Sequence, residues 1–384
     1  MILAKTGNEA MAYAMRQINP DVVAAYPITP STEIVQLFAT YVNDGLVDTE
    51  FVPVESEHSA MAACIGSAAS GCRTMTATAS QGLALMHEML FIAGGLRLPI
   101  TVPIASRSLS SPLNIHCDHS DSFASRDSGW MQFFAETVQE GYDTLLQAVK
   151  IAEMASLPAI VSIDGFILSH CMERIDVLND QDVRDWLGPY KPNYNLLNLD
   201  HPILIGPAAL QDYYFEFKRS QIEGMRNALP VIKQVTQDFN QLSGRAYGIV
   251  EEYRCDDARA VILLMGSACG AGRAAVDKLR HEGKKVGMVK LRVFRPLPHG
   301  LLKKTLSGFK TIGVLDRVDA VNSYGGPLYT EITSLLYDAV EKPRVFSYVY
   351  GLGGKEFTPE DAEAVLRSVL TGKKEELVTY VGVR

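Results

Sequence analysis

The sequence predicts an α/β fold, with a doubly wound parallel sheet in the first part of the chain and a second α/β unit in the last part. Short apolar runs alternate with longer amphipathic stretches, a pattern typical of parallel strands covered by helices. The run at 98–105 is apolar throughout, which indicates a strand buried on both faces. The length of 384 residues is enough for two or three domains.

The expected elements of the first unit follow from the periodicity of its apolar residues. Strands are predicted at 22–26, 74–78, 98–105 and 158–164, and helices at 9–17, 33–41, 60–69, 81–94 and 139–155. Prolines and asparagines then gather between 188 and 207, ahead of a polar helical stretch at 211–242. This change in composition indicates a connector between two domains.

The second unit repeats the alternation. Its expected strands and helices are 260–265, 273–282, 285–291, 311–316, 327–338, 344–350 and 359–370. A glycine-rich turn at 266–272 has its glycines at the wrong offsets for a dinucleotide-binding motif, so close packing of a helix on a strand is the preferred interpretation. We therefore predict a first domain at 1–185, a connector at 186–244 and a second domain at 245–384.

The bulk composition narrows the class of protein. Apolar residues make up 47% of the chain and charged residues 21%, as in ordinary soluble proteins. The net charge of −8 argues against a dedicated nucleic-acid binder. No apolar run is long enough to span a bilayer, and the first residues lack the layout of a signal peptide. We expect a cytoplasmic protein that binds neither nucleic acid nor a membrane.

The candidate metal ligands do not form a recognisable metal site. None of the cysteines forms a CxxC pair, and their spacing fits neither zinc nor an iron–sulfur cluster. A polar loop at 108–129 contains His116, Asp118, His119 and Asp121, but their spacing matches no known His/Asp site. We expect reduced thiols, no metal held by this chain, and a loop that faces a substrate or a partner. The cysteines are Cys64, Cys72, Cys117, Cys171, Cys255 and Cys269.

The stretch at 51–83 is the most informative part of the chain. Glu55 and Glu57 directly follow the apolar strand end at 51–54 and precede a helix of small residues at 60–69. In open α/β sheets, ligands bind outside the carboxyl ends of the strands. A carboxylate at this junction is therefore suited to a crevice that faces a ligand.

Two further side chains follow predicted strands in the same way. Thr29 lies on a loop stiffened by Pro27 and Pro30, ahead of a helix that Ser31 or Thr32 can cap. Its side chain can contact a ligand or can merely satisfy backbone groups. Arg107 ends the strand at 98–105, where its planar fork can bind both oxygens of a carboxylate. The alternative is a surface arginine paired with a carboxylate of a loop.

Seven segments, spread in order over nearly the whole chain, resemble one known family. They are YPITPST at 26–32, ESEHSA at 55–60, TATASQGL at 76–83, ASRSLSSPLNIHCDHSD at 105–121, LRVFRPLP at 291–298, LDRVDAVNSYGGPLY at 315–329 and YGLGGKEFTPED at 350–361. The sequence resembles the α subunit of the 2-oxoacid:ferredoxin oxidoreductases, most closely their pyruvate branch.

This resemblance implies a thiamine-diphosphate enzyme that converts pyruvate, coenzyme A and oxidised ferredoxin to acetyl-coenzyme A, carbon dioxide and reduced ferredoxin. It implies a pyrimidine-binding domain followed by a domain like the C-terminal domain of transketolase. The family's cofactor glutamate corresponds to Glu57, with Glu55 as the second choice. A half-buried carboxylate there holds the ring nitrogen N1′ in the state that lets the cofactor lose a proton from its thiazolium carbon.

The resemblance also implies substrate and cofactor contacts. Thr29 and Arg107 are expected to bind pyruvate, with Arg107 holding its carboxylate in position. His119 and Asp121 lie in the segment expected near the pyruvate site. The remaining implied cofactor contacts are Pro27, Ile28, Ser80 and Gln81.

One missing motif implies partner subunits. Thiamine domains that hold the diphosphate carry a GDG motif, and the sequence contains none. The resemblance therefore implies a β subunit with the diphosphate, Mg²⁺ and a [4Fe-4S] cluster, a γ subunit, and a ferredoxin-like δ subunit with two clusters. Three alternatives stay open: action on 2-oxoglutarate, a branched-chain 2-oxoacid or oxalate; a non-catalytic interaction subunit; and a dehydrogenase- or transketolase-type enzyme that uses no ferredoxin.

Overall fold

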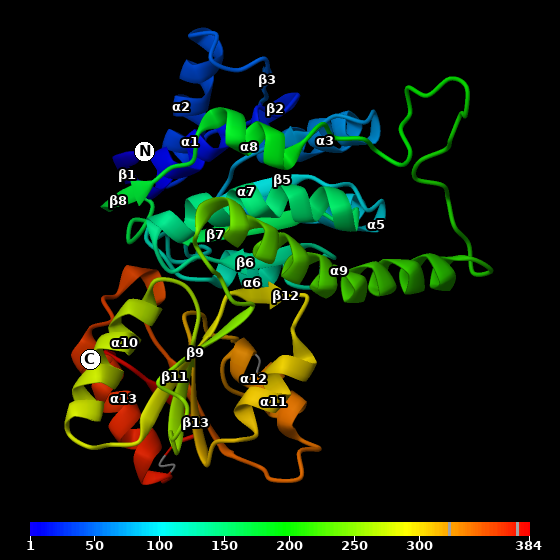
Figure 1. Ribbon diagram of the computed structural model, residues 1–384. Helices are drawn as coiled ribbons and strands as arrows, with labels where there is room; N and C mark the ends of the chain where they lie inside the picture. Colours follow the sequence, from blue (N-terminus) through cyan, green and yellow to red (C-terminus); the bar gives the residue numbers. More distant parts are fainter. Residues whose placement is uncertain (322–323, 374–375) are drawn as a thin grey trace.

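The computed structural model describes residues 1–321, 324–373 and 376–384. It contains a seven-stranded sheet, a six-stranded sheet and a separate small two-stranded sheet. The two larger sheets lie one above the other in Figure 1, with the N-terminus in the upper body and the C-terminus in the lower one. The predicted α/β fold with mainly parallel sheets is confirmed.

The seven-stranded sheet has the order β12-β6-β7-β5-β4-β2-β3 and is parallel except for its edge strand β12. β12 comes from far along the chain and pairs antiparallel with β6. The strands are β2 (Val22–Ala25), β3 (Glu50–Pro53), β4 (Thr74–Met75), β5 (Thr101–Ser106), β6 (Met131–Phe134), β7 (Ala159–Asp164) and β12 (Val293–Arg295).

Helices cover both faces of this sheet, because successive strand residues point to opposite sides. Val161 and Ile163 of β7 pack with α1 and α7 on one face, while Ile160 packs with α3 and α5 on the other. This alternation explains why the strand sequences are apolar throughout. The helices are α1 (Gly7–Ile18), α2 (Thr32–Asn43), α3 (Glu57–Ala69), α4 (Ser80–Leu85), α5 (His87–Gly95), α6 (Ser120–Ala124), α7 (Val138–Ala155) and α8 (Asp180–Leu187).

Local sequence signals predict where some helices begin and end, but not all of them. Thr6 and Glu9 form a capping box that begins α1 directly after β1 (Ile2–Thr6), the strand that pairs antiparallel with β8 (Met172–Asp176). The expected side-chain cap of α2 is wrong, because the Ser31 hydroxyl donates to the carbonyl of Ile28 instead. The single helix expected at 81–94 is divided into α4 and α5 at Met86.

The segment between the two large sheets ends in one long helix. Residues 188–213 contain no helix or strand and form the green loop that projects at the right of Figure 1. α9 (Tyr214–Ser243) then packs along α7 of the first sheet. The domain boundaries at 185 and 245 remain predictions.

The six-stranded sheet has the order β15-β14-β13-β10-β11-β9 and is parallel except for β9. Gly272 of the glycine-rich turn permits close packing of α10 on the sheet, because a Cβ there would lie 2.6 Å from Met288 Sδ. Close helix–strand packing is thus confirmed. The elements are β9 (Val250–Tyr253), β10 (Ala260–Leu264), α10 (Ala268–His281), β11 (Val286–Leu291), α11 (His299–Leu306), β13 (Thr311–Asp316), α12 (Pro327–Leu336), β14 (Arg344–Val349), η1 (Leu352–Gly354), α13 (Pro359–Thr371) and β15 (Val378–Tyr380).

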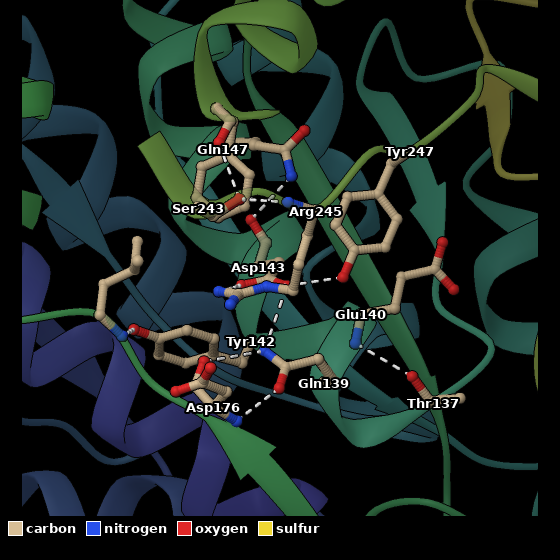
Figure 2. Close-up of polar contacts among 12 residues, drawn as sticks. Thr137, Gln139, Glu140, Tyr142, Asp143, Gln147, Asp176, Ser243, Arg245 and Tyr247 are labelled. Carbon is tan, nitrogen blue, oxygen red and sulfur yellow. Dashed lines mark hydrogen bonds and ion pairs between the residues drawn. The ribbon is translucent and has the colours of Figure 1, made fainter. Parts of the chain in front are cut away.

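A cluster of polar side chains fastens α7 to the segment that leads into the second sheet (Figure 2). The buried Asp143 carboxylate accepts two hydrogen bonds from the Arg245 guanidinium, at 2.6 and 2.8 Å, and one from the Tyr247 hydroxyl at 2.6 Å. Burial raises the pKa of Asp143, and the bonds from Arg245 oppose this rise. We call this group the seam cluster.

Within the described ranges, no helix combines the length and the apolar character needed to cross a bilayer.

Candidate active site

Four of the candidate residues follow neighbouring parallel strands. Thr29 follows β2, Glu57 follows β3, Ser80 follows β4 and Arg107 follows β5, and these strands are adjacent in the order β5-β4-β2-β3. The chain moves to one side of β2 to form β3 and to the other side to form β4. This reversal of strand order is where open α/β sheets leave a crevice for ligands.

Glu57 is buried yet has no protein partner. It is the first residue of α3, and its side chain is 6% exposed. Within the described part of the chain, no donor hydrogen-bonds its carboxylate. A Cβ on Gly82, in α4, would lie 2.7 Å from Glu57 Oε1 and would also clash with the Thr78 hydroxyl. Glycine at position 82 therefore lets the Glu57 carboxylate lie directly against α4, where it still lacks a hydrogen bond within the described residues.

Glu55 has a different environment, although it lies only two residues away. It is exposed and accepts a hydrogen bond from the Ser59 hydroxyl, which lowers the pKa of Glu55. Its hydrogen-bonding capacity is met by its own segment and by solvent. Glu57 is therefore the better candidate for contact with a bound ring.

Arg107 and Thr29 lie side by side. Arg107 Nη1 donates to the Thr29 carbonyl and Nε donates to the Asn114 carbonyl, each at 2.9 Å. No acceptor among the described residues lies within hydrogen-bonding distance of Nη2, and the Thr29 hydroxyl is likewise without a partner there. Burial lowers the pKa of Arg107, which the nearby Asp121 carboxylate partly offsets. The guanidinium is thus aimed by two carbonyls and keeps donors for a ligand.

Asp121 holds the ends of two strands together. Its Oδ2 accepts from the backbone nitrogens of Ser80 at 2.9 Å and Arg107 at 3.0 Å, and its Oδ1 accepts from that of Ser122 at 2.6 Å. Burial raises the pKa of Asp121 to about 6. The carboxylate therefore links the start of α4, which carries Ser80 and Gln81, to the strand end that carries Arg107.

Ser80, Pro27 and Ile28 occupy the same edge of the sheet. Ser80 is buried with a positive φ of 47°, and its hydroxyl lies 2.6 Å from the Ser108 carbonyl. Pro27 is exposed and Ile28 is half-buried on the loop that carries Thr29. Gln81 is half-buried at the start of α4.

His119 contacts the end of a different strand, β7. It is buried, and its Nε2 lies 2.8 Å from Asp164, at the end of β7. Arg317, from the second sheet, donates to the same carboxylate at 2.9 Å. Although burial alone would raise the pKa of Asp164, His119 and Arg317 lower it well below its usual range.

Asp164 and His119, together with Cys117, form a group of potential metal ligands within the described residues. Arg317 already neutralises the carboxylate of this group, which fits a structural contact between the two sheets better than a cation site.

Sequence reasoning missed three contributors to the site. Gly82 and Thr78 border the Glu57 carboxylate, and Asn114 orients Arg107. Gly82 lies in a segment used for the family resemblance, so that signal was available. Asn114 lies in a loop without periodicity, and its role depends on a partner far along the chain.

The fold and these strand-end residues define a thiamine-diphosphate-binding class of protein, and the family models agree. Residues 13–237 match the thiamine-diphosphate-binding domain of pyruvate flavodoxin/ferredoxin oxidoreductases. Residues 258–362 match core domain II of pyruvate:ferredoxin oxidoreductases. The chain belongs to this family, as the sequence resemblance predicted.

Curated relatives and a solved structure refine this placement. The chain is 49% identical to "Pyruvate synthase subunit PorA" of Thermotoga maritima over 385 residues, covering 100% of this chain and 98% of that one. It is 44% identical to "Ketoisovalerate oxidoreductase subunit VorA" of Pyrococcus abyssi over 361 residues, covering 94% and 91%. The 2-oxoglutarate:ferredoxin oxidoreductase of Magnetococcus marinus, solved with 2-oxoglutarate, coenzyme A and succinyl-CoA bound, superposes with a TM-score of 0.74. At 22% identity, over 96% of this chain and 65% of that one, this likeness shows a shared fold.

Proposed function

We propose that this chain is the α subunit of a pyruvate:ferredoxin oxidoreductase, which converts pyruvate, coenzyme A and oxidised ferredoxin to acetyl-coenzyme A, carbon dioxide and reduced ferredoxin, or runs the reverse synthesis. The observation that carries the proposal is the buried Glu57 carboxylate, which lies against Gly82 and has no hydrogen-bond donor among the described residues. Full-length identity to a pyruvate synthase subunit supports the same reaction.

Glu57 is proposed to accept a hydrogen bond from ring nitrogen N1′ of thiamine diphosphate. Bound thiamine diphosphate supplies a nucleophilic carbon and an electron sink for decarboxylation. A carboxylate removed from water makes a stronger hydrogen bond than one in solvent, because the local dielectric constant is low. Gly82 lets the Glu57 carboxylate lie against α4. The residues Pro27, Ile28, Ser80 and Gln81 are proposed to contact the cofactor from the neighbouring strand ends.

Arg107 is proposed to bind the carboxylate of pyruvate through the donors that the protein leaves free, with Thr29 donating to a substrate oxygen. Holding the carboxylate while the adjacent bond breaks is a positioning role. His119 and Asp121 remain proposed neighbours of the substrate. Their partners within the protein, Asp164 for His119 and the strand-end nitrogens for Asp121, favour an organising role.

The missing parts of the reaction are proposed to lie on partner subunits. The sequence has no GDG motif and no run of cysteines suited to a cluster. We assign the diphosphate contacts, Mg²⁺ and a [4Fe-4S] cluster to a β subunit, and further clusters to a ferredoxin-like δ subunit beside a γ subunit. Ferredoxin is the proposed electron acceptor, coenzyme A the co-substrate and the cytoplasm the proposed location.

A branched-chain 2-oxoacid is the second candidate substrate, because the ketoisovalerate relative is 44% identical over 94% of the chain. The segment HCDHSD at 116–121 favours pyruvate. A non-catalytic role is disfavoured, since Glu57, Thr29 and Arg107 are all present and follow strands of the same sheet at the same edge.

The test is to purify the chain with its neighbouring gene products and to measure thiamine, iron and ferredoxin reduction. We expect turnover with pyruvate and coenzyme A to exceed that with 2-ketoisovalerate and 2-oxoglutarate. The chain alone should contain no iron and show no activity. Preference for 2-ketoisovalerate would reassign the substrate, and activity of the single chain would contradict the division of the site between subunits.

A further inference from the structure

The loop that follows β5 supplies one of the two carbonyls that orient Arg107. Residues 110–113, 115 and 116 of this loop are exposed, and His116 near its end contacts Phe166 with its ring and accepts a hydrogen bond from the Ser108 nitrogen at 3.0 Å. The Asn114 carbonyl lies 2.9 Å from Arg107 Nε. The direction of the guanidinium therefore depends on whatever holds Asn114.

The Asn114 amide both donates and accepts hydrogen bonds, and its Oδ1 also lies 3.3 Å from His116 Nδ1. Its Nδ2 donates to the carbonyl of Gly353 at 2.9 Å, and its Oδ1 accepts from the His116 backbone nitrogen at 2.8 Å. A carbonyl can only accept and a backbone N–H can only donate, so these partners determine the orientation of the amide. The Asn114 side chain thus hydrogen-bonds both within its own loop and to Gly353, a residue 239 positions away.

Gly353 belongs to the turn η1, which directly follows the last residues of β14 in the six-stranded sheet. Its φ is +59°, and a Cβ there would collide with Asn114 Nδ2. The next residue, Gly354, has a φ of +80° and donates from its nitrogen to the Cys117 carbonyl at 2.6 Å. The turn therefore needs glycine both for its backbone conformation and for its close approach to the loop.

We propose that Asn114 is a positioning residue for the substrate site, through which the glycine turn of the second sheet sets the direction of Arg107. This inference rests on the proposed function, in which Arg107 binds the carboxylate of a 2-oxoacid. Asn114 makes no contact with Glu57 or Gly82, so it acts on substrate binding and leaves cofactor binding alone.

The experiment compares Asn114→Ala, Arg107→Ala and the double variant in the assembled enzyme. Loss of one neutral hydrogen bond of ordinary strength corresponds to about a two- to tenfold change. We expect Asn114→Ala to raise the KM for pyruvate by about that factor, with kcat and thiamine content near those of the wild type. In the Arg107→Ala background the same substitution should have no further effect on KM, because residues that act through each other are not additive.

Two further variants serve as controls. Asn198→Ala removes an asparagine that closes an exposed loop elsewhere, by accepting from the Asp200 nitrogen, and should leave KM unchanged. Asn114→Asp keeps the size of the side chain and the acceptor for His116 but removes the donor to Gly353. It should raise KM as Asn114→Ala does, even if the alanine variant assembles poorly.

The outcomes separate this inference from the proposed function. An unchanged KM in both Asn114 variants overturns the inference, and so does an Asn114→Ala effect that persists undiminished in the Arg107→Ala background. If Arg107→Ala itself leaves the KM for pyruvate unchanged, the proposed role of Arg107 fails and the inference fails with it.

Discussion

The seam cluster and the strand-end site both bury charged side chains, but they differ in how completely the protein satisfies them. In the seam cluster, both oxygens of Asp143 accept hydrogen bonds from Arg245, and Tyr247 adds another (Figure 2). In the strand-end site, Glu57 has no donor within the described ranges, and Arg107 uses its Nε and Nη1 but leaves Nη2 without an acceptor there.

This difference separates structural charges from functional ones. A buried ion pair whose hydrogen bonds are complete holds two segments together and has nothing left to offer a ligand. The Glu57 carboxylate has no hydrogen-bond donor within the described ranges, so it remains able to accept a hydrogen bond from a ligand. The comparison can be tested by removing one side chain from each region.

The largest expected effect is on turnover, from Glu57→Gln. The amide keeps the shape of the side chain but removes the negative charge that is proposed to hold a proton on the cofactor ring. We expect kcat to fall by about 10²- to 10⁴-fold, the usual range for a proton-transfer group. Steady-state ferredoxin reduction by the assembled complex measures this.

Glu55→Gln is the matched control, because Glu55 is exposed and bonded to Ser59. It should retain nearly normal turnover. The reverse result, with Glu55→Gln inactive and Glu57→Gln active, would transfer the cofactor role to Glu55.

The second effect is on stability, from Asp143→Ala in the seam cluster. Removing one partner of a buried charge pair costs about 3–5 kcal/mol, because the other charge is left unpaired. We expect a clearly lower thermal midpoint of the complex, while the KM for pyruvate stays unchanged. Asp185→Ala, which removes an exposed carboxylate bonded to Gln181, should have little effect on the midpoint. A raised KM in Asp143→Ala would show that the seam cluster also affects substrate binding, which would contradict its purely structural role.

The third effect is on substrate affinity, from Arg107→Ala. A hydrogen bond to a charged group contributes about 1.5–3 kcal/mol, so the KM for pyruvate should rise by about 10- to 100-fold. Arg107→Lys keeps the charge but lacks the planar fork, and it should recover only part of the loss. Full recovery by lysine would show that charge alone matters at this position.

The smallest effect is on the pH profile. Because burial raises the pKa of Asp121 to about 6, this carboxylate gains a proton as the pH falls through that value. The protonated group is a poorer acceptor for the Ser80 and Arg107 nitrogens, so kcat/KM for pyruvate should rise with pH through about 6 and level off above it. Asp121→Asn should lower kcat/KM and flatten this acidic limb. If kcat/KM of the variant still falls at acidic pH as in the wild type, another group is responsible for that fall.

Much of the fold was predictable, because the patterns are strong. The strands at 260–265 and 311–316 and the helix at 139–155 were expected within a residue of their observed ends. The short strands were missed, including β1, β8 and β12, because isolated runs of three to five residues carry little periodicity. The pairing of β12 with β6 joins segments about 160 residues apart, which no local pattern records.

The order of strands and helices, the family and the residue types at the strand ends were determined by the sequence itself, since periodicity and motifs are local properties of the chain. Only the tertiary structure distinguished the environments of Glu55, which is exposed, and Glu57, which is buried. The junction from strand to helix breaks the periodic pattern that would assign each side chain to a face. Only the tertiary structure, likewise, showed that His119 is bonded to Asp164 and that Asn114 is bonded to Gly353. These contacts join residues that are distant in the chain, and packing of the two sheets brings them together.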